Sequence, residues 1–132
     1  MISFLESASL EAMRTERSGR CFTLVRFAPA GWAALDAELR VLAALIAAHL
    51  RRTDVVCLLR QREVGVVLID AGPEQAQAPV TRIQRAAKVH LPRLEVRAGW
   101  AAVGPGQERT WQEAWRWAGQ LLVADAAVPA AA

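Results

Sequence analysis

The sequence feature that most constrains the fold is a pair of short apolar runs, 55–59 and 64–69, separated by the polar tetrapeptide RQRE (60–63). Runs rich in Val, Leu and Ile on either side of a short polar segment predict two antiparallel strands joined in a β-hairpin. The end of the second run, 66–69, is apolar without alternation, so we expect this strand to be covered on both faces. The tip contains none of the Gly, Asn, Asp or Pro residues that usually form hairpin turns, which makes it an unusual turn.

Helical periodicity surrounds the hairpin. Residues 33–51 carry apolar side chains at three- and four-residue steps, the pattern of a helix with one buried stripe. The stripe consists of Leu35, Leu39, Leu42, Ile46 and Leu50. The same reasoning predicts further helices over 3–17, 74–89 and 110–125, and strands over 21–27 and 94–103. The order α-β-α-β-β-α-β-α predicts the α/β class, an α/β sandwich with a central, mostly antiparallel sheet flanked by helices.

Local signals describe the first helix. Ser3, with Glu6 three residues later, has the pattern of a capping box that begins a helix. Leu5, Leu10 and Met13 are expected to give this helix a partly apolar face.

Signals in the second half of the chain are weaker. Pro79 falls inside the third predicted helix, where its missing N–H is expected to bend or restart the helix. The Ala/Pro tail, 126–132, is expected to fray, so the domain is assigned to 1–125. Met1 and this tail favour a complete protein over an excised domain.

Length and composition indicate one soluble domain. The chain has 132 residues, of which 54% are apolar and 22% are charged, as in an ordinary globular domain with a buried core. The net charge is +3, and Lys88 is the only lysine among 16 basic residues. No basic run is longer than two residues, so a nucleic-acid partner is not expected.

The apolar stretches and the cysteines indicate in which compartment of the cell the protein is expected. The longest apolar stretch, around 41–50, is about half a membrane span, so no membrane insertion is expected. The N terminus carries Glu6 and Glu11 and lacks the pattern of a signal peptide. Cys21 and Cys57 fall in strand-like runs without a metal or redox spacing, and two buried thiols favour the cytoplasm.

The middle of the sequence resembles a GGDEF domain, the family of diguanylate cyclases that make cyclic di-GMP. Asp36 and Leu39 stand where the family has D-x-x-L, and Arg51 and Asp54 stand where it has R-x-x-D. Five residues follow, and RQREV (60–64) then occupies the position of the GGDEF motif without a gap.

Two later segments extend the resemblance over most of the chain. LEVRAGWA (94–101) is similar to the family's strand that ends in S-I-G-V-A, with Gly99 at its glycine. WRWAGQLL (115–122) is similar to the last helix of the family, with Ala118 kept.

The active-site residues depart from the family. Arg60 and Gln61 replace both glycines of the motif, Arg62 replaces the acid after them, and only Glu63 is kept. In the family these glycines let backbone N–H groups approach the substrate phosphates. Arg26 stands nearest the metal-binding Asp of the first strand, and a cation there repels Mg²⁺. We therefore expect no cyclase activity, no metal and no cofactor, and a salt bridge between Arg26 and Glu63 instead.

The kept R-x-x-D matches the family's inhibitory site, which binds cyclic di-GMP away from the catalytic pocket. A guanidinium can bind guanine O6 and N7, or a phosphate, with two hydrogen bonds, and a carboxylate can accept from guanine N1–H and N2–H. The resemblance implies Arg51 and Asp54 as ligand-binding residues pointing outward from the helix end, with Arg82 as a third contact. Arg85 is the alternative to Arg82, and Arg52 is an additional phosphate contact.

Two functions stay open. The first is a non-catalytic cyclic di-GMP receptor that regulates a partner protein; in the family the ligand commonly stacks as a dimer at such sites, which would bring two copies together. The alternative is a ligand-free, GGDEF-derived interaction scaffold with Trp117 as a partner anchor. Arg51 and Asp54 would then be structural, as a helix-end arginine and a turn aspartate. An active cyclase is disfavoured by the tip residues.

Overall fold

The computed structural model describes residues 3–30, 34–59 and 62–127, the last five of these by their backbone alone, and contains the elements in the expected order. They are α1 (Phe4–Ser18), β1 (Phe22–Pro29), α2 (Asp36–Ala48), β2 (Val55–Leu58), β3 (Val64–Leu68), α3 (Pro73–His90), β4 (Val96–Val103) and α4 (Trp111–Ala127). Within the described part of the chain, no helix is long and apolar enough to cross a membrane.

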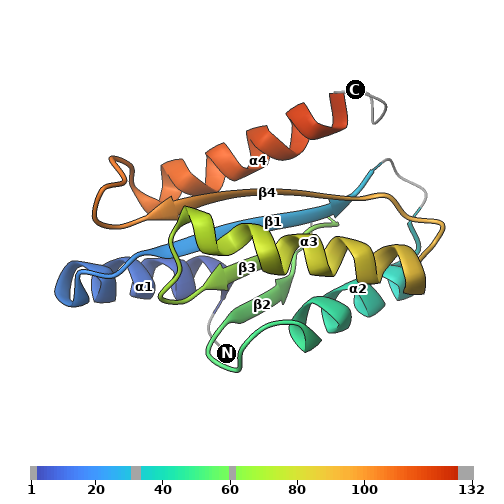
Figure 1. Cartoon of the computed structure of the whole chain (residues 1–132), viewed down its shortest axis with the longest axis horizontal. Coiled ribbons are helices and arrows are strands. Elements are labelled where there is room, and N and C mark those ends of the chain that lie inside the picture. The colour runs from blue at the N-terminus through green and yellow to red at the C-terminus, as the bar shows by residue number, and fades with distance from the viewer. Residues whose placement is uncertain (1–2, 31–33, 60–61, 128–132) are drawn as a thin grey trace.

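The four strands form one sheet in the order β2-β3-β1-β4, and every neighbouring pair is antiparallel (Figure 1). The predicted hairpin is confirmed as β2 and β3, with Leu58 opposite Val64 and the N–H of Leu59 donating to the carbonyl of Glu63 at 2.8 Å. All five residues of β3 are buried, as the run without alternation predicted. The strand lies between β2 and β1, so its whole length belongs to the core.

Two helices cover each face of the sheet. On one face, α2 and α3 pack against one set of strand side chains, including Val25, Phe27 and Val66. On the other face, α1 and α4 pack against the alternate set, including Phe22, Leu24 and Val67. This is the predicted α/β sandwich, and the alternation along β1 is what sends neighbouring side chains to opposite faces.

Helix α1 begins as predicted but buries a different face. The Ser3 hydroxyl accepts from the N–H of Glu6, and the Glu6 carboxylate accepts from the N–H of Ser3, which is the expected capping box. The partly apolar face of Leu5, Leu10 and Met13 is not the face that packs on the sheet, since all three are exposed. The buried face is Phe4, Ala8, Glu11 and Thr15. Ala8 and Thr15 in this face are small and let the helix lie close to the sheet, while Leu10 and Met13 on the other side point toward solvent.

Helix α2 is shorter than predicted at both ends. Leu35 is the N-cap residue and is exposed, so it does not belong to the buried stripe. The helix ends at Ala48, with His49 at its C-cap, so Arg51 lies in the turn beyond the helix rather than in its last turn. Helix α3, by contrast, runs through Pro79 as one helix, so no restart divides it.

The remaining expectations concern the tail and the cysteines. Helix α4 continues to Ala127, past the expected end at 125, and 128–132 lie outside the described residues. Cys57 lies in β2, whereas Cys21 lies just before β1. Both thiols are free and only partly buried, and burial raises the pKa of Cys57.

The contact between β4 and α4 predicts a strong effect of one glycine. A Cβ at Gly99 would lie 2.1 Å from the carbonyl oxygen of Ala118, so Gly99→Ala is expected to lower the free energy of unfolding by about 2–3 kcal/mol through overpacking. Gly72→Ala is the control, because its Cβ would meet only the flexible end of Gln75 at 3.1 Å. Urea unfolding measures both, and equal losses would contradict the close approach.

Candidate functional site

The main candidate site is a hollow of about 390 Å³ between the end of α2, the turn into β2, the end of β3 and the first half of α3. Polar side chains from three of these segments line it: Arg51, Asp54, Asp70, Gln75 and Arg82. Its volume falls in the range of about 300–1,000 Å³ that small-molecule sites occupy. The fold therefore brings Arg51, Asp54 and Arg82 together, although Arg82 is far from the other two in sequence.

Asp54 holds the wall of the hollow together. One carboxylate oxygen accepts from the N–H of Ile69 at 3.0 Å and from Arg51 Nη2 at 3.3 Å. The other accepts from the N–H of Arg51 at 3.0 Å and from Arg51 Nε at 3.4 Å. These four contacts match the acceptor capacity of a carboxylate, and the side chain is only 2% exposed. Asp54 therefore ties the turn to the end of β3 and does not point outward, in contrast to the expectation.

Arg51 is the outward-facing member of the pair. Its side chain is 59% exposed, and its Nη2 also donates to the carbonyl of Ile69. Among the described residues, Nη1 has no hydrogen-bond partner. The guanidinium is thus fixed along one edge by Asp54 and Ile69 and retains free donors along the other.

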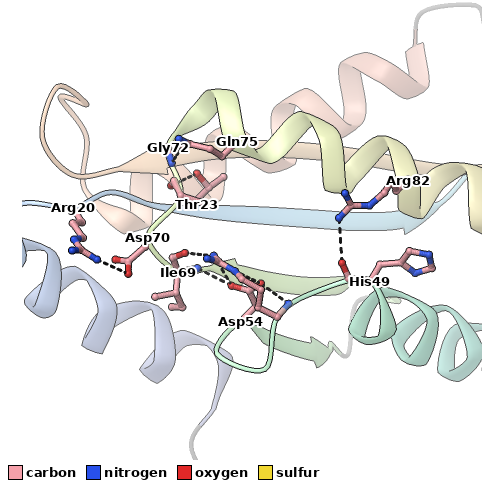
Figure 2. A network of polar contacts seen from close by, with 11 residues as sticks. Arg20, Thr23, His49, Asp54, Ile69, Asp70, Gly72, Gln75 and Arg82 are labelled. Atoms are coloured by element: carbon pink, nitrogen blue, oxygen red, sulfur yellow. Dashed lines mark hydrogen bonds and ion pairs between the residues drawn. The ribbon is translucent and has the colours of Figure 1, made fainter.

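Arg82 faces the same hollow from α3. Figure 2 shows its side chain extending from the helix toward His49, whose carbonyl oxygen lies 3.5 Å from Nη2. That distance is at the limit of a hydrogen bond, so the contact holds the guanidinium only weakly. Gln75 and Pro79 precede Arg82 at seven- and three-residue steps, which places all three along one side of α3.

Two arginines that the sequence suggested lie outside the hollow, and two residues that it did not suggest line it. Arg52 and Arg85 are exposed, but neither lines the hollow. Asp70 does line it: Oδ2 accepts from Arg20 Nη1 at 3.1 Å, and Oδ1 has no partner among the described residues. Neither Asp70 nor Gln75 was among the residues that the sequence indicated for the site. The usable signal is that Asp70 directly follows the apolar run 64–69, and polar side chains on loops that follow buried strands often form binding sites.

The hairpin tip contains a second polar cluster, at the other end of β3. The predicted salt bridge is confirmed: Arg26 Nε donates to Glu63 Oε1 at 2.8 Å, and Nη2 donates to Oε2 at 3.1 Å. Arg26 Nη1 donates to the carbonyl of Trp115, and the guanidinium lies 4.4 Å from the centre of the Trp115 ring. The Arg26 and Glu63 side chains are only 16% and 14% exposed, so both are largely buried, and their own atoms occupy the space at the tip.

Arg62 closes the tip against α2. It has a positive φ of 63°, and its guanidinium donates to the Asp36 carboxylate at 3.2 Å and to the carbonyl of Ala34. Arg60 and Gln61 lie outside the described residues. Within the described ranges, no group of three His, Cys, Asp or Glu side chains could hold a metal ion.

Helix α4 makes room for this cluster. A Cβ at Gly119 would lie 2.3 Å from Arg26 Nη1 and 2.9 Å from its central guanidinium carbon. The glycine therefore allows the guanidinium to reach the helix backbone at Trp115, one turn earlier.

No protein-family model and no curated protein matches the sequence. Solved structures do match: the FimX GGDEF domain from Pseudomonas aeruginosa has a TM-score of 0.81 at 18% identity, over 94% of this chain and 86% of that one. This chain has a GGDEF-like fold. At this identity the likeness establishes the arrangement of the elements and not the chemistry of the sites.

Two other structures with the GGDEF-like fold were solved with a bound molecule. The GGDEF domain of DgcB from Caulobacter crescentus, in complex with cyclic di-GMP, has a TM-score of 0.79 at 13% identity, over 92% of this chain and 81% of that one. The diguanylate cyclase SiaD, in complex with its activator SiaC from Pseudomonas aeruginosa, has a TM-score of 0.79 at 18% identity, over 93% of this chain. This chain spans 52% of the SiaD chain.

The salt bridge at the tip predicts an asymmetry between two ion pairs. Glu63→Ala would leave the largely buried Arg26 guanidinium without its carboxylate, and a loss of roughly 2–3 kcal/mol in the free energy of unfolding is expected. Asp36→Ala removes the carboxylate of the exposed pair with Arg62 and should cost less than about 1 kcal/mol. Urea unfolding compares the two variants. A double variant, Arg26→Met with Glu63→Leu, should recover most of the loss; no recovery would mean that Glu63 acts through other contacts.

Proposed function

We propose that the protein is a non-catalytic receptor for cyclic di-GMP that regulates a partner protein. The observation that carries this proposal is the convergence of Arg51 and Arg82, from the α2–β2 turn and from α3, on one hollow. Guanidinium groups bind phosphates and the O6/N7 edge of guanine with paired hydrogen bonds, and cyclic di-GMP offers two of each. Its neighbours in fold include a GGDEF domain with cyclic di-GMP bound, which supports the choice of ligand.

The proposed contacts assign different roles to the two aspartates. Arg51 donates from Nη1, and Arg82 turns from its weak contact with His49 to donate to the same phosphate or base. Asp54 is a positioning residue, since its oxygens already hold Arg51 and Ile69. The acceptor for guanine N1–H and N2–H is instead Asp70, because Asp70 lines the hollow and its Oδ1 has no partner among the described residues.

The absence of cyclase activity is part of the proposal. Phosphoryl transfer of this kind uses divalent metal ions held by carboxylates. At the tip, Glu63 is paired with Arg26 through two hydrogen bonds, and the guanidinium of Arg62 is paired with Asp36. A guanidinium at the position expected for a metal-binding acid, already paired with the one acid that is kept, disfavours Mg²⁺, so the tip is proposed to serve structure alone.

A ligand-free interaction scaffold is the second candidate. It is favoured by the hydrogen bonds that the Arg51 guanidinium already donates to Asp54 and to the carbonyl of Ile69 without any ligand. It is also favoured by Trp117, which is exposed on α4 as an interface anchor would be.

Calorimetric titration with cyclic di-GMP separates the two candidates. The unaltered chain should bind, and Arg51→Ala and Arg82→Ala should each weaken binding by about tenfold or more, because each removes charge-assisted hydrogen bonds. Arg52→Ala and Arg85→Ala are matched controls outside the hollow and should leave the affinity within about twofold. Asp70→Asn should weaken cyclic di-GMP binding more than cyclic di-AMP binding, since only guanine presents the N1–H and N2–H donors. No heat from the unaltered chain at high micromolar ligand would support the scaffold instead.

The proposed loss of catalysis has its own test. Incubation with GTP and Mg²⁺, followed by chromatography of the nucleotides, should yield no cyclic di-GMP from the unaltered chain. Formation of the product at a rate above that of a heat-denatured control would overturn the non-catalytic assignment while leaving the ligand site intact.

A further inference from the structure

The outer face of α1 carries a symmetric pattern of charge and apolar surface. Its members are Glu6, Leu10, Met13 and Arg17, here called the outer stripe. They follow one another at steps of four, three and four residues, so they lie along one side of the helix. The order along the stripe is acid, apolar, apolar, base. A second copy running in the opposite direction therefore places a base beside each acid and an apolar residue beside each apolar residue.

The outer stripe faces away from the rest of the molecule. The residues that α1 buries against the sheet lie on the opposite side of the helix, at Phe4, Ala8, Glu11 and Thr15. Leu10 is 43% exposed and Met13 is 53% exposed, in adjacent turns of the helix. Large apolar side chains that adjoin in this way, with charges at both ends, are typical of a surface that another helix covers.

We propose that α1 packs antiparallel against α1 of a second copy of this chain. The two-fold axis passes through the middle of the outer stripe, at the height along the helix that lies between Glu11 and Ala12. Antiparallel pairing places Leu10 against the partner's Met13, and by symmetry Met13 against the partner's Leu10. The same operation places Glu6 beside the partner's Arg17 at both ends of the contact. The step pattern is that of the contact positions of a coiled coil, so the side chains can interlock.

Charge selects this orientation over the parallel one. A parallel pair would place Glu6 beside Glu6 and Arg17 beside Arg17, which is repulsive at both ends. The neighbouring Arg14 is already paired with Glu11 of its own helix at 2.9 Å, and Ser9 is small, so neither obstructs the approach. About three turns of helix make a small interface, so the dimer is weak and depends on concentration.

This self-association is independent of the proposed ligand site. Helix α1 covers the face of the sheet opposite to α2 and α3, which form the hollow. Association through the outer stripe therefore requires no cyclic di-GMP, and its failure would leave the receptor proposal untouched.

Sedimentation velocity of the full chain without nucleotide tests the dimer, between about 10 µM and 1 mM, where a small interface populates its dimer. The unaltered chain should dimerise with rising concentration. Glu6→Arg and Arg17→Glu should each raise the dissociation constant about tenfold, because each turns both end contacts repulsive. An equimolar mixture of the two variants should associate again as a heterodimer, since both end contacts then join opposite charges.

Controls keep each result interpretable. Arg40→Glu reverses an exposed charge on α2 and should leave association unchanged. Glu6→Arg also removes the capping box, so Met13→Glu provides a second disruption: it should abolish the dimer without shifting the urea midpoint. A monomeric unaltered chain at the highest concentration, or a variant mixture that associates no better than its components, would overturn the proposal.

Discussion

The complete burial of β3 is the constraint on which the rest of the structure depends. A strand with apolar side chains on both faces requires a neighbour on each edge and helices above and below, which the four-stranded sheet and its two helix layers supply. Both polar clusters lie where this strand leaves the core. Glu63 stands just before it, and Ile69 and Asp70 stand just after it, so the tip and the hollow are separated by the length of one strand.

The two clusters differ in how fully their charges are satisfied. At the tip, the Arg26 guanidinium donates to both Glu63 oxygens and to a backbone carbonyl, and it stacks on Trp115. Its donors are used within the fold. At the hollow, Arg82 has a single long contact, and Arg51 has donors to spare. For this reason an external anion can accept more hydrogen bonds from arginine at the hollow than at the tip.

Periodicity and spacing predicted the order of elements, the hairpin and the Arg26–Glu63 pair, because these depend on local pattern or on equivalent positions in a known fold. The buried face of α1 was not predictable in the same way. A count of apolar residues favours Leu10 and Met13, whereas the sheet accepts the face with the smaller Ala8 and Thr15. The state of Asp54 was also beyond local pattern, since it depends on Ile69, which lies fifteen residues away, just after the next strand.

The contacts around Arg51 have a consequence for the entropy of recognition. A free arginine side chain samples many rotamers, and fixing them on binding costs up to about 2 kcal/mol. Here Asp54 and the carbonyl of Ile69 restrict those rotamers as the chain folds. A ligand that accepts from Nη1 thus meets a guanidinium that is already oriented. The carboxylate that looks like a competitor for the ligand is also what makes its arginine preorganised.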